Sequence, residues 1–172
     1  MQSVTVSTRS TVGGGYNGFW QSKKRYRVVK GGKGSKKSAT TALNIIYRMM
    51  KYKDANTLVV RQVMDTHRTS TFAQLKWAIS RLKVGHLWKS TVSPMEITYI
   101  PTGQKILFRG FDDVLKLAST TVESGYLCWV WIEEAYEIPS ESDFDKLDLS
   151  VPRGAVPKPL FKQTTITFNP WH

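Results

Sequence analysis

The stretch that decides the fold is GGKGSKKS, which runs from Gly31 to Ser38. It satisfies the nucleotide-binding pattern G-x-x-x-x-G-K-[ST] except at the second glycine, where Lys36 stands. In such a loop, glycines let the backbone curl so that its N–H groups face a phosphate, a lysine neutralises the β/γ charge, and a hydroxyl holds Mg²⁺. The stretch therefore predicts either a phosphate-binding loop with one substitution or a glycine-rich turn whose lysines face water.

The residues on either side supply the strand and the helix that a phosphate loop needs. RYRVVKGG (Arg25–Gly32) is typical of a short strand that runs into a turn. Apolar residues then recur at helical spacing as far as Met50, so a helix is expected to begin near Lys36. We expect Lys36 to take a negative φ in the first turn of that helix, with its side chain directed away from the phosphates. Lys37 would then reach the phosphates, and Ser38 would hold the metal. The predicted nucleotide-binding residues are Gly31, Gly32, Lys33, Gly34, Ser35, Lys36, Lys37 and Ser38.

A pair of acids ends the most hydrophobic strand candidate, YLCWVWIEE (Tyr126–Glu134). Adjacent acids at the end of a buried strand place one carboxylate toward the metal and the other toward the attacking water. Glu133 would serve the metal and Glu134 would activate water. The alternative is that the acids only mark where a buried strand meets solvent. A pair of acids downstream of a phosphate-loop candidate favours the catalytic interpretation.

Further segments predict a sheet flanked by helices. TLVVRQVM (Thr57–Met64) suits a strand buried on both faces, and an apolar stripe from Phe72 to Leu82 predicts a helix that stops at Gly85. MEITYI and KILFRG flank a turn at Pro101–Gln104 and predict a hairpin, and a last strand covers Thr164–Phe168. Strands that alternate with helices predict an α/β fold with helices on both faces of the sheet.

Charge and composition narrow the class of partner. Of the 172 residues, 41% are hydrophobic, which suits one folded domain. Residues 1–110 carry 20 Lys and Arg against 3 Asp and Glu, whereas residues 111–172 carry 5 against 10. A charge distribution this uneven favours a protein that binds a polyanion such as nucleic acid. The alternative is a solvated surface with an incidental charge bias. No apolar run approaches the roughly 18 residues of a membrane span, and the single cysteine, Cys128, suits the cytoplasm.

Taken together, these segments resemble the N-terminal ATPase domain of the tailed-phage terminase large subunit, and in particular its PBSX-type prophage branch. The likeness extends over nearly the whole chain from about Tyr16. It is carried by VVKGGKGSKKS (Val28–Ser38), NTLVVRQV (Asn56–Val63), PTGQKILFRGFDD (Pro101–Asp113), WVWIEEAYEI (Trp129–Ile138) and TFNP (Thr167–Pro170).

The resemblance implies a P-loop NTPase of the ASCE type, with a central, mostly parallel sheet, helices on both faces and a β-hairpin. It implies a DNA-packaging motor that hydrolyses ATP with Mg²⁺ to move double-stranded DNA into a procapsid. The motor would be a homo-oligomeric ring in the host cytoplasm, with the portal protein and the small terminase subunit as partners and no membrane. Residues 25–172 would form the ATPase domain, with residues 1–24 an extension packed on it. The family's nuclease domain would follow residue 172.

The family's functional residues carry over to this chain with two departures. Glu133 matches the Walker B acid, which is usually Asp, and Glu134 matches the catalytic glutamate. Thr167 and Asn169 lie in the coupling motif. Lys36 replaces the usual glycine. The arginine that many members supply in trans is also missing between residues 112 and 125. Candidates for its role are Lys116, Arg61, Arg68 and Arg109, although Arg61 is equally suited to cap the rim of the sheet.

Two other functions stay open at this point. One is a basic DNA-binding module whose degenerate loop has little ATPase activity, and the other is a helicase-like P-loop ATPase. The DNA-binding module and the motor both predict polyanion binding. Only an ATPase predicts Mg²⁺-dependent hydrolysis of ATP that Glu134→Gln abolishes.

Overall fold

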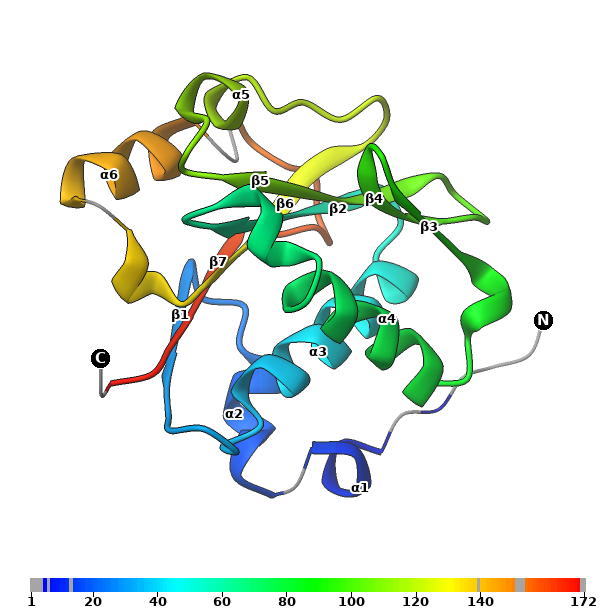
Figure 1. Ribbon diagram of the computed structural model, residues 1–172. Helices are drawn as coiled ribbons and strands as arrows, with labels where there is room; N and C mark the ends of the chain where they lie inside the picture. Colours follow the sequence, from blue (N-terminus) through cyan, green and yellow to red (C-terminus); the bar gives the residue numbers. More distant parts are fainter. Residues whose placement is uncertain (1–4, 6, 13, 139, 151–153, 171–172) are drawn as a thin grey trace.

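The computed structural model of the chain describes residues 5, 7–12, 14–138, 140–150 and 154–170. A seven-stranded sheet runs through the centre of the molecule (Figure 1). Five neighbouring strands are parallel, and the last two continue the sheet as an antiparallel meander. In spatial order the strands are β1 (Tyr26–Lys30), β7 (Gln163–Phe168), β6 (Tyr126–Glu133), β2 (Ala55–Arg61), β5 (Gln104–Gly110), β4 (Met95–Tyr99) and β3 (Trp88–Val92).

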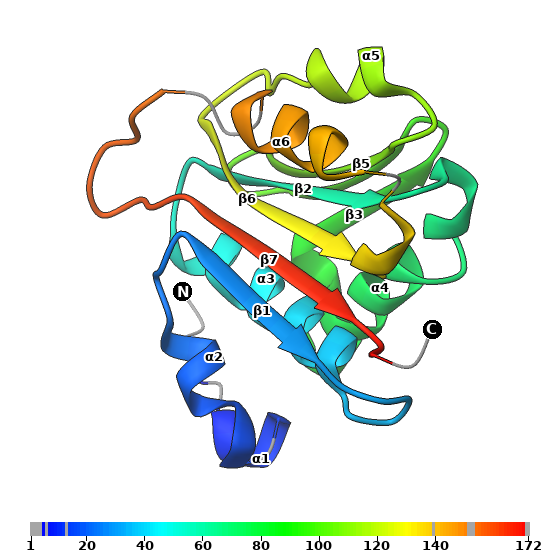
Figure 2. The ribbon, with the colours of Figure 1, turned by 90° about the vertical axis from the view of Figure 1, so that its left-hand side faces the viewer.

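Helices cover both faces of this sheet, which confirms the predicted α/β fold class (Figure 2). One face is covered by α3 (Lys37–Lys51) and α4 (Thr71–Arg81), with α1 (Thr8–Val12) and α2 (Asn17–Gln21) beside them. The other face is covered by α5 (Val114–Ala118) and α6 (Glu141–Ser150). The short 3-10 helices are η1 (Gly14–Tyr16), η2 (Met64–His67), η3 (Gly85–Leu87) and η4 (Ala135–Glu137). Within the described residues, no helix is long and apolar enough to cross a bilayer.

The two cores follow from strict alternation along the buried strands. In β6, Trp129 and Trp131 pack toward α3 and α4, whereas Val130 and Ile132 pack toward α5 and α6. Successive side chains of a strand point to opposite faces, so a strand covered on both sides tends to be apolar along its whole length. The continuous apolar run of β6 is therefore what carries Glu133 to the edge of the sheet.

The N-terminal segment is bonded to the sheet through two buried arginines. Arg48 of α3 donates to the carbonyl oxygens of Trp20 and Ser22, and Arg27 of β1 donates to that of Phe19. All of these acceptors are neutral, so burial lowers the pKa of Arg27 to about 8. Residues 19–22 are therefore held against α3 and β1.

Two expectations about element boundaries were wrong. Strand β2 ends at Arg61 rather than at Met64, because the chain turns there into η2 and the Met64 N–H is bonded to the Asp112 carboxylate. Helix α4 ends at Arg81, before Gly85. Strand β3 was not anticipated, because only one of its side chains is buried and an edge strand of this kind lacks an apolar alternation.

A buried histidine should make the stability of the fold depend on pH. His67 is fully buried, donates from Nε2 to the Arg109 carbonyl oxygen at 2.7 Å, and accepts at Nδ1 from the Thr71 hydroxyl at 2.6 Å. Burial lowers its pKa to about 4, below the ordinary 6.5. The unfolded chain therefore binds this proton first, and stability is lost as the pH falls through the window from about 6.5 to 4.

We expect the free energy of unfolding to fall by up to about 3 kcal/mol across that window because of this residue. Urea denaturation at pH 7 and pH 4 measures the effect, with His67→Gln as the control that removes the titrating group. If the variant loses as much stability between these pH values as the unmodified chain, His67 is not the group responsible.

Candidate active site

The carboxyl ends of β1, β7 and β6 meet at one edge of the sheet (Figure 2). Lys30 at the end of β1 lies opposite Phe168 of β7, and Thr167 of β7 lies opposite Glu133 of β6. The loop after β1 and the acids after β6 therefore lie at the same edge, with one additional strand between them. Ligands of open α/β sheets bind at this edge.

The loop between β1 and α3 is a tight turn. The Gly31 N–H donates to the Phe168 carbonyl oxygen at 3.2 Å, and the Ser35 N–H donates to that of Gly32 at 3.1 Å. A Cβ on Gly31 would lie 2.6 Å from the Ser35 hydroxyl oxygen, so any other residue there would displace the Ser35 side chain. From the N-terminal segment, the Tyr16 hydroxyl donates to the Ser35 carbonyl oxygen. The sequence gives no signal for this contact.

Lys36 contradicts the backbone expectation. Its φ of 62° and ψ of 13° are left-handed, so the expected negative φ was wrong. The turn has to reverse into the N-terminus of α3 at this residue, and the lysine takes the conformation that the missing glycine would take. A non-glycine residue in this region is strained by roughly 1–2 kcal/mol. The Lys36 side chain is exposed, whereas Lys37, the first residue of α3, is buried.

Lys36→Gly should therefore stabilise the protein. We expect the free energy of unfolding to rise by up to about 1 kcal/mol, because relief of the left-handed strain exceeds the entropy that glycine adds to the unfolded chain. Lys33→Gly is the matched control, since Lys33 is an exposed lysine of the same loop without a positive φ. The control should lose about 0.5 kcal/mol. Equal losses for both variants in urea denaturation would show that Lys36 is not strained.

Lys37, Ser38 and Glu133 come together at the first turn of α3. Glu133 is 7% exposed, and burial raises the pKa of its carboxyl above the ordinary value. The hydrogen bond with the Ser38 hydroxyl and the positive charges of Arg61 and Lys37 act in the opposite direction. Among the described residues, no carboxylate lies within 4 Å of the Lys37 ammonium group. That charge is therefore available to an anionic ligand.

A hollow of about 450 Å³ lies beside these residues. Ser38 and Glu133 form one side of it, and α4 with the residue before its N-cap forms the other through Thr69, Ser70, Ala73, Gln74 and Trp77. A hydroxyl and a carboxylate are the hard oxygen ligands that Mg²⁺ takes when phosphates and waters complete its octahedron. In the described part of the chain, no cluster of three or more acids, histidines and cysteines could hold a metal ion. The two oxygens fit Mg²⁺ held jointly with a phosphate.

Glu134 lies just past the end of β6 in a strained conformation. Its φ of 53° and ψ of 52° are left-handed, and its side chain hydrogen-bonds with Tyr136. Within the part of the chain described here, its carboxylate oxygen Oε2 is buried and has no hydrogen-bond partner. An unsatisfied buried oxygen and a strained backbone are both unfavourable, and such features concentrate at functional sites. Glu134 is thus a carboxylate with a free acceptor oxygen, directly after Glu133 at the end of β6.

The candidates for a trans-acting cation lie apart from one another. Arg61 is held within its own chain, since it donates to Ser70 Oγ at 2.9 Å and pairs with the Glu137 carboxylate at 3.4 Å. Arg109 donates to the Thr120 hydroxyl at 3.1 Å. Lys116 is exposed on α5, over the other face of the sheet from α3. Only Arg61 is close enough to affect Glu133.

The two coupling residues also have different surroundings. Thr167 is fully buried and accepts a hydrogen bond from Trp131 Nε1 at 2.9 Å, so it ties β7 to β6 directly beside Glu133. Asn169 follows the end of β7 and is partly buried. The sequence placed both residues at a strand end, but it gave no indication that Thr167 faces the core.

Sequence relatives of this chain are large terminase subunits. Residues 23–172 match the family model described as phage terminase large subunit. The chain is 45% identical over 130 residues to "Terminase, large subunit" of Bacillus phage SPP1, which covers 76% of this chain and 31% of that protein. It is 38% identical over 116 residues to "PBSX phage terminase large subunit" of Bacillus subtilis (strain 168), which covers 67% of this chain and 25% of that protein. The matches thus span less than a third of either relative.

Solved structures share the fold at low sequence identity. A large terminase from a thermophilic bacteriophage aligns with a TM-score of 0.62 at 14% identity, over 85% of this chain and 34% of that one. The Thermus phage P74-26 large terminase ATPase domain aligns with a TM-score of 0.59 at 13% identity, over 86% of this chain and 61% of that one. A structure of the first of these terminases in complex with ATP-gamma-S aligns with a TM-score of 0.57 at 12% identity, over 85% of this chain and 32% of that one.

Proposed function

This chain belongs to the phage terminase large subunit family, and from that premise we propose that it is the ATP-hydrolysing domain of a viral DNA-packaging motor. The observation that carries the proposal is that Ser38 and Glu133 line one hollow at the edge of the sheet, with Lys37 and Glu134 close enough for their charges to affect the pKa of Glu133. The neighbouring structures named as an ATPase domain and as an ATP-gamma-S complex support nucleotide binding at a fold of this kind.

In the proposed complex, the triphosphate lies over the loop from Gly31 to Ser38. The N–H groups at the start of α3 and the Lys37 ammonium group stabilise the charge of the β- and γ-phosphates. The Ser38 hydroxyl and the Glu133 carboxylate hold Mg²⁺, which neutralises charge on the phosphate oxygens when it is bound. Because Lys37 and Glu133 are both nearly excluded from solvent, their charges act in a medium of low dielectric constant.

Glu134 acts on the water in this proposal. Its unpartnered carboxylate oxygen accepts a hydrogen bond from a water molecule in line with the γ-phosphate and takes up a proton as the water attacks. The bond from the γ-phosphorus to the bridging oxygen breaks, and ADP leaves with phosphate as the second product. The left-handed backbone at Glu134 turns the chain out of the line of β6 at this residue.

The motor function extends beyond this chain. We propose that Thr167 and Asn169 transmit the state of the γ-phosphate along β7, and that the domains assemble as a ring on the portal protein with the small terminase subunit. The ring acts on double-stranded DNA in the host cytoplasm. Arg61 serves as a rim residue that positions η2 and η4, because its guanidinium is already bonded within its own chain. An exposed cation such as Lys116 is better placed to reach a neighbouring copy.

The experiment that tests the proposal is release of phosphate from ATP with and without Mg²⁺, in the unmodified chain and in Glu134→Gln. Mg²⁺-dependent release that the substitution abolishes supports the ATPase. Binding of DNA without any turnover of ATP would favour the alternative, a basic DNA-binding module with a degenerate loop.

A further inference from the structure

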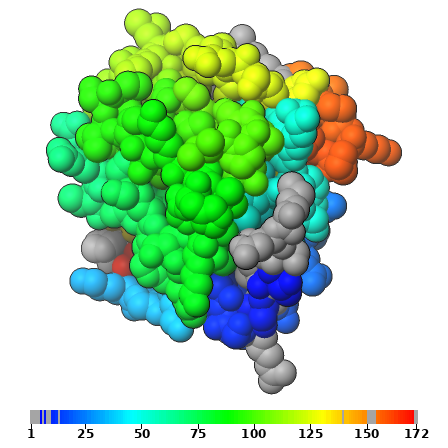
Figure 3. All heavy atoms as spheres, turned by 90° about the vertical axis from the view of Figure 1, so that its right-hand side faces the viewer, coloured from blue at the N-terminus to red at the C-terminus, as the bar shows by residue number. Residues whose placement is uncertain are grey.

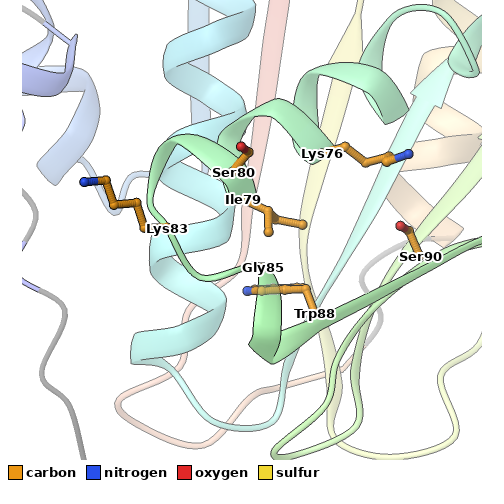
Figure 4. A pocket seen from close by; sticks show the side chains of 7 residues that line it. All are labelled: Lys76, Ile79, Ser80, Lys83, Gly85, Trp88 and Ser90. Atoms are coloured by element: carbon orange, nitrogen blue, oxygen red, sulfur yellow. The ribbon is translucent and has the colours of Figure 1, made fainter.

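A second hollow lies between α4 and β3, at the opposite end of α4 from the hollow beside Ser38. It has a volume of about 460 Å³ and is lined by Lys76, Ile79, Ser80, Lys83, Trp88 and Ser90, together with Gly85 (Figure 4). The indole of Trp88 is 8% exposed, and its Nε1–H is buried with no hydrogen-bond partner among the described residues. A buried donor left without an acceptor is unfavourable, so an acceptor supplied by a ligand would recover that lost free energy.

The charge around this hollow has one sign. From residue 66 to residue 95 the sequence has five Lys and Arg residues and no Asp or Glu. The next acid, Glu96, is paired with Lys105 at 2.8 Å and lines a different hollow, on the α5 side of the sheet with Leu107. The segment is green in Figure 3 and occupies much of the face shown there. An anionic ligand is therefore the kind that suits this hollow, which offers a free indole N–H, two serine hydroxyls and ammonium groups.

The spacing of the lysines indicates the shape of that anion. Figure 4 shows Lys76 and Lys83 at opposite ends of the hollow, with their ammonium groups directed away from each other and Ile79, Ser80 and Trp88 between them. Lys76 lies on α4, whereas Lys83 lies two residues past the end of that helix and has a left-handed φ of 58°. Two cations so placed do not converge on one small anion. They suit a chain of phosphates, since one strand of B-DNA places a charge about every 3.4 Å along its axis.

We infer that this hollow is a contact site for the phosphodiester backbone of double-stranded DNA. The Trp88 Nε1–H donates to a central phosphate, and Lys76 and Lys83 neutralise phosphates on either side. The inference rests on the proposed function, because it names the surface through which the motor domain meets its DNA. Helix α4 then contributes residues to both hollows, since Gln74 and Trp77 line the hollow beside Ser38 whereas Lys76, Ile79 and Ser80 line the hollow beside Trp88.

The test is fluorescence anisotropy of a short labelled DNA duplex of mixed sequence, titrated with the chain at a series of KCl concentrations. The double variant Lys76→Gln/Lys83→Gln should bind at least about tenfold more weakly and should lower the slope of log affinity against log salt by about 2, since each lost phosphate contact removes about 0.9. The matched control is Lys146→Gln/Lys158→Gln, which removes two exposed lysines elsewhere. The control should leave the slope unchanged.

Trp88→Phe adds a second readout. It removes a neutral donor, which releases no counterion, so affinity should fall about threefold to tenfold without a change in the salt slope. Lys76 and Lys83 are exposed, so their substitution should not disturb the fold. The double lysine variant therefore tests the inference even if Trp88→Phe folds poorly. If the lysine pair shifts affinity and slope no more than the control does, the inference is wrong.

A third experiment adds inorganic phosphate to the bound DNA and compares it with chloride at the same ionic strength. Phosphate should displace DNA no better than chloride does, and preferential displacement would instead make the hollow a site for free phosphate and overturn the inference. All titrations are done without nucleotide, so their failure is distinguishable from a failure of ATP hydrolysis at Lys37 or Glu134.

Discussion

Glu134→Gln is expected to lower the rate of ATP hydrolysis by about a hundredfold to ten-thousandfold while binding of ATP is retained. The amide has the shape of the carboxylate but cannot take up the proton of the attacking water. Nothing in the loop or at Lys37 is altered, so the ground-state complex should form as before. Release of phosphate measured at saturating ATP, with binding of a fluorescent ATP analogue measured in parallel, separates these two effects.

The matched control is Glu141→Gln, which removes an exposed acid at the start of α6. It should hydrolyse ATP within about twofold of the unmodified chain, because a surface carboxylate away from the hollow has no part in the reaction. Turnover by Glu134→Gln at a rate similar to that of the control would show that another group activates the water.

Lys37→Ala is expected to reduce both binding and hydrolysis. Loss of a buried cation beside the phosphates should lower the rate by about a hundredfold to a thousandfold, and the affinity for ATP by tenfold or more. Because Lys37 is buried at the start of α3 and its charge acts on Glu133, its removal leaves the phosphate charge without its nearest counter-charge.

The adjacent lysine is the control for this second substitution. Lys36→Ala removes an exposed ammonium group and keeps a Cβ at the left-handed position, so it should change the affinity for ATP no more than about threefold. A larger loss for Lys36→Ala than for Lys37→Ala, measured by titration of a fluorescent ATP analogue, would exchange the roles of the two residues.

Local sequence patterns predicted the elements better than they predicted how the elements meet. The apolar run of β6, the glycine turn before α3 and the hairpin at residues 101–104 are visible as composition and spacing, and the structure has each of them. Insertion of β7 between β1 and β6 pairs β7 with residues of β1 that are more than a hundred positions away, and no local periodicity carries that information. The proximity of the loop to the acids was therefore an expectation from the chemistry of the two motifs and from the family resemblance, not from local periodicity.

The conformations at the site were predicted less well, for two physical reasons. The motif shows that position 36 belongs to the loop, but it does not give the backbone conformation there. The closed turn requires a left-handed backbone at this position, and Lys36 adopts it despite the strain. A buried tryptophan needs an acceptor, but its packing decides whether it finds one. Trp131 finds Thr167, and Trp88 does not find a partner among the described residues.

The most direct test of the central claim is a crystal structure of the chain with a non-hydrolysable ATP analogue and Mg²⁺. We expect the β- and γ-phosphates over residues 31–38 with the Lys37 ammonium group against them, and the metal bound by the Ser38 hydroxyl next to Glu133. A triphosphate bound away from this loop, or held by the Lys36 ammonium group in place of that of Lys37, would contradict the account.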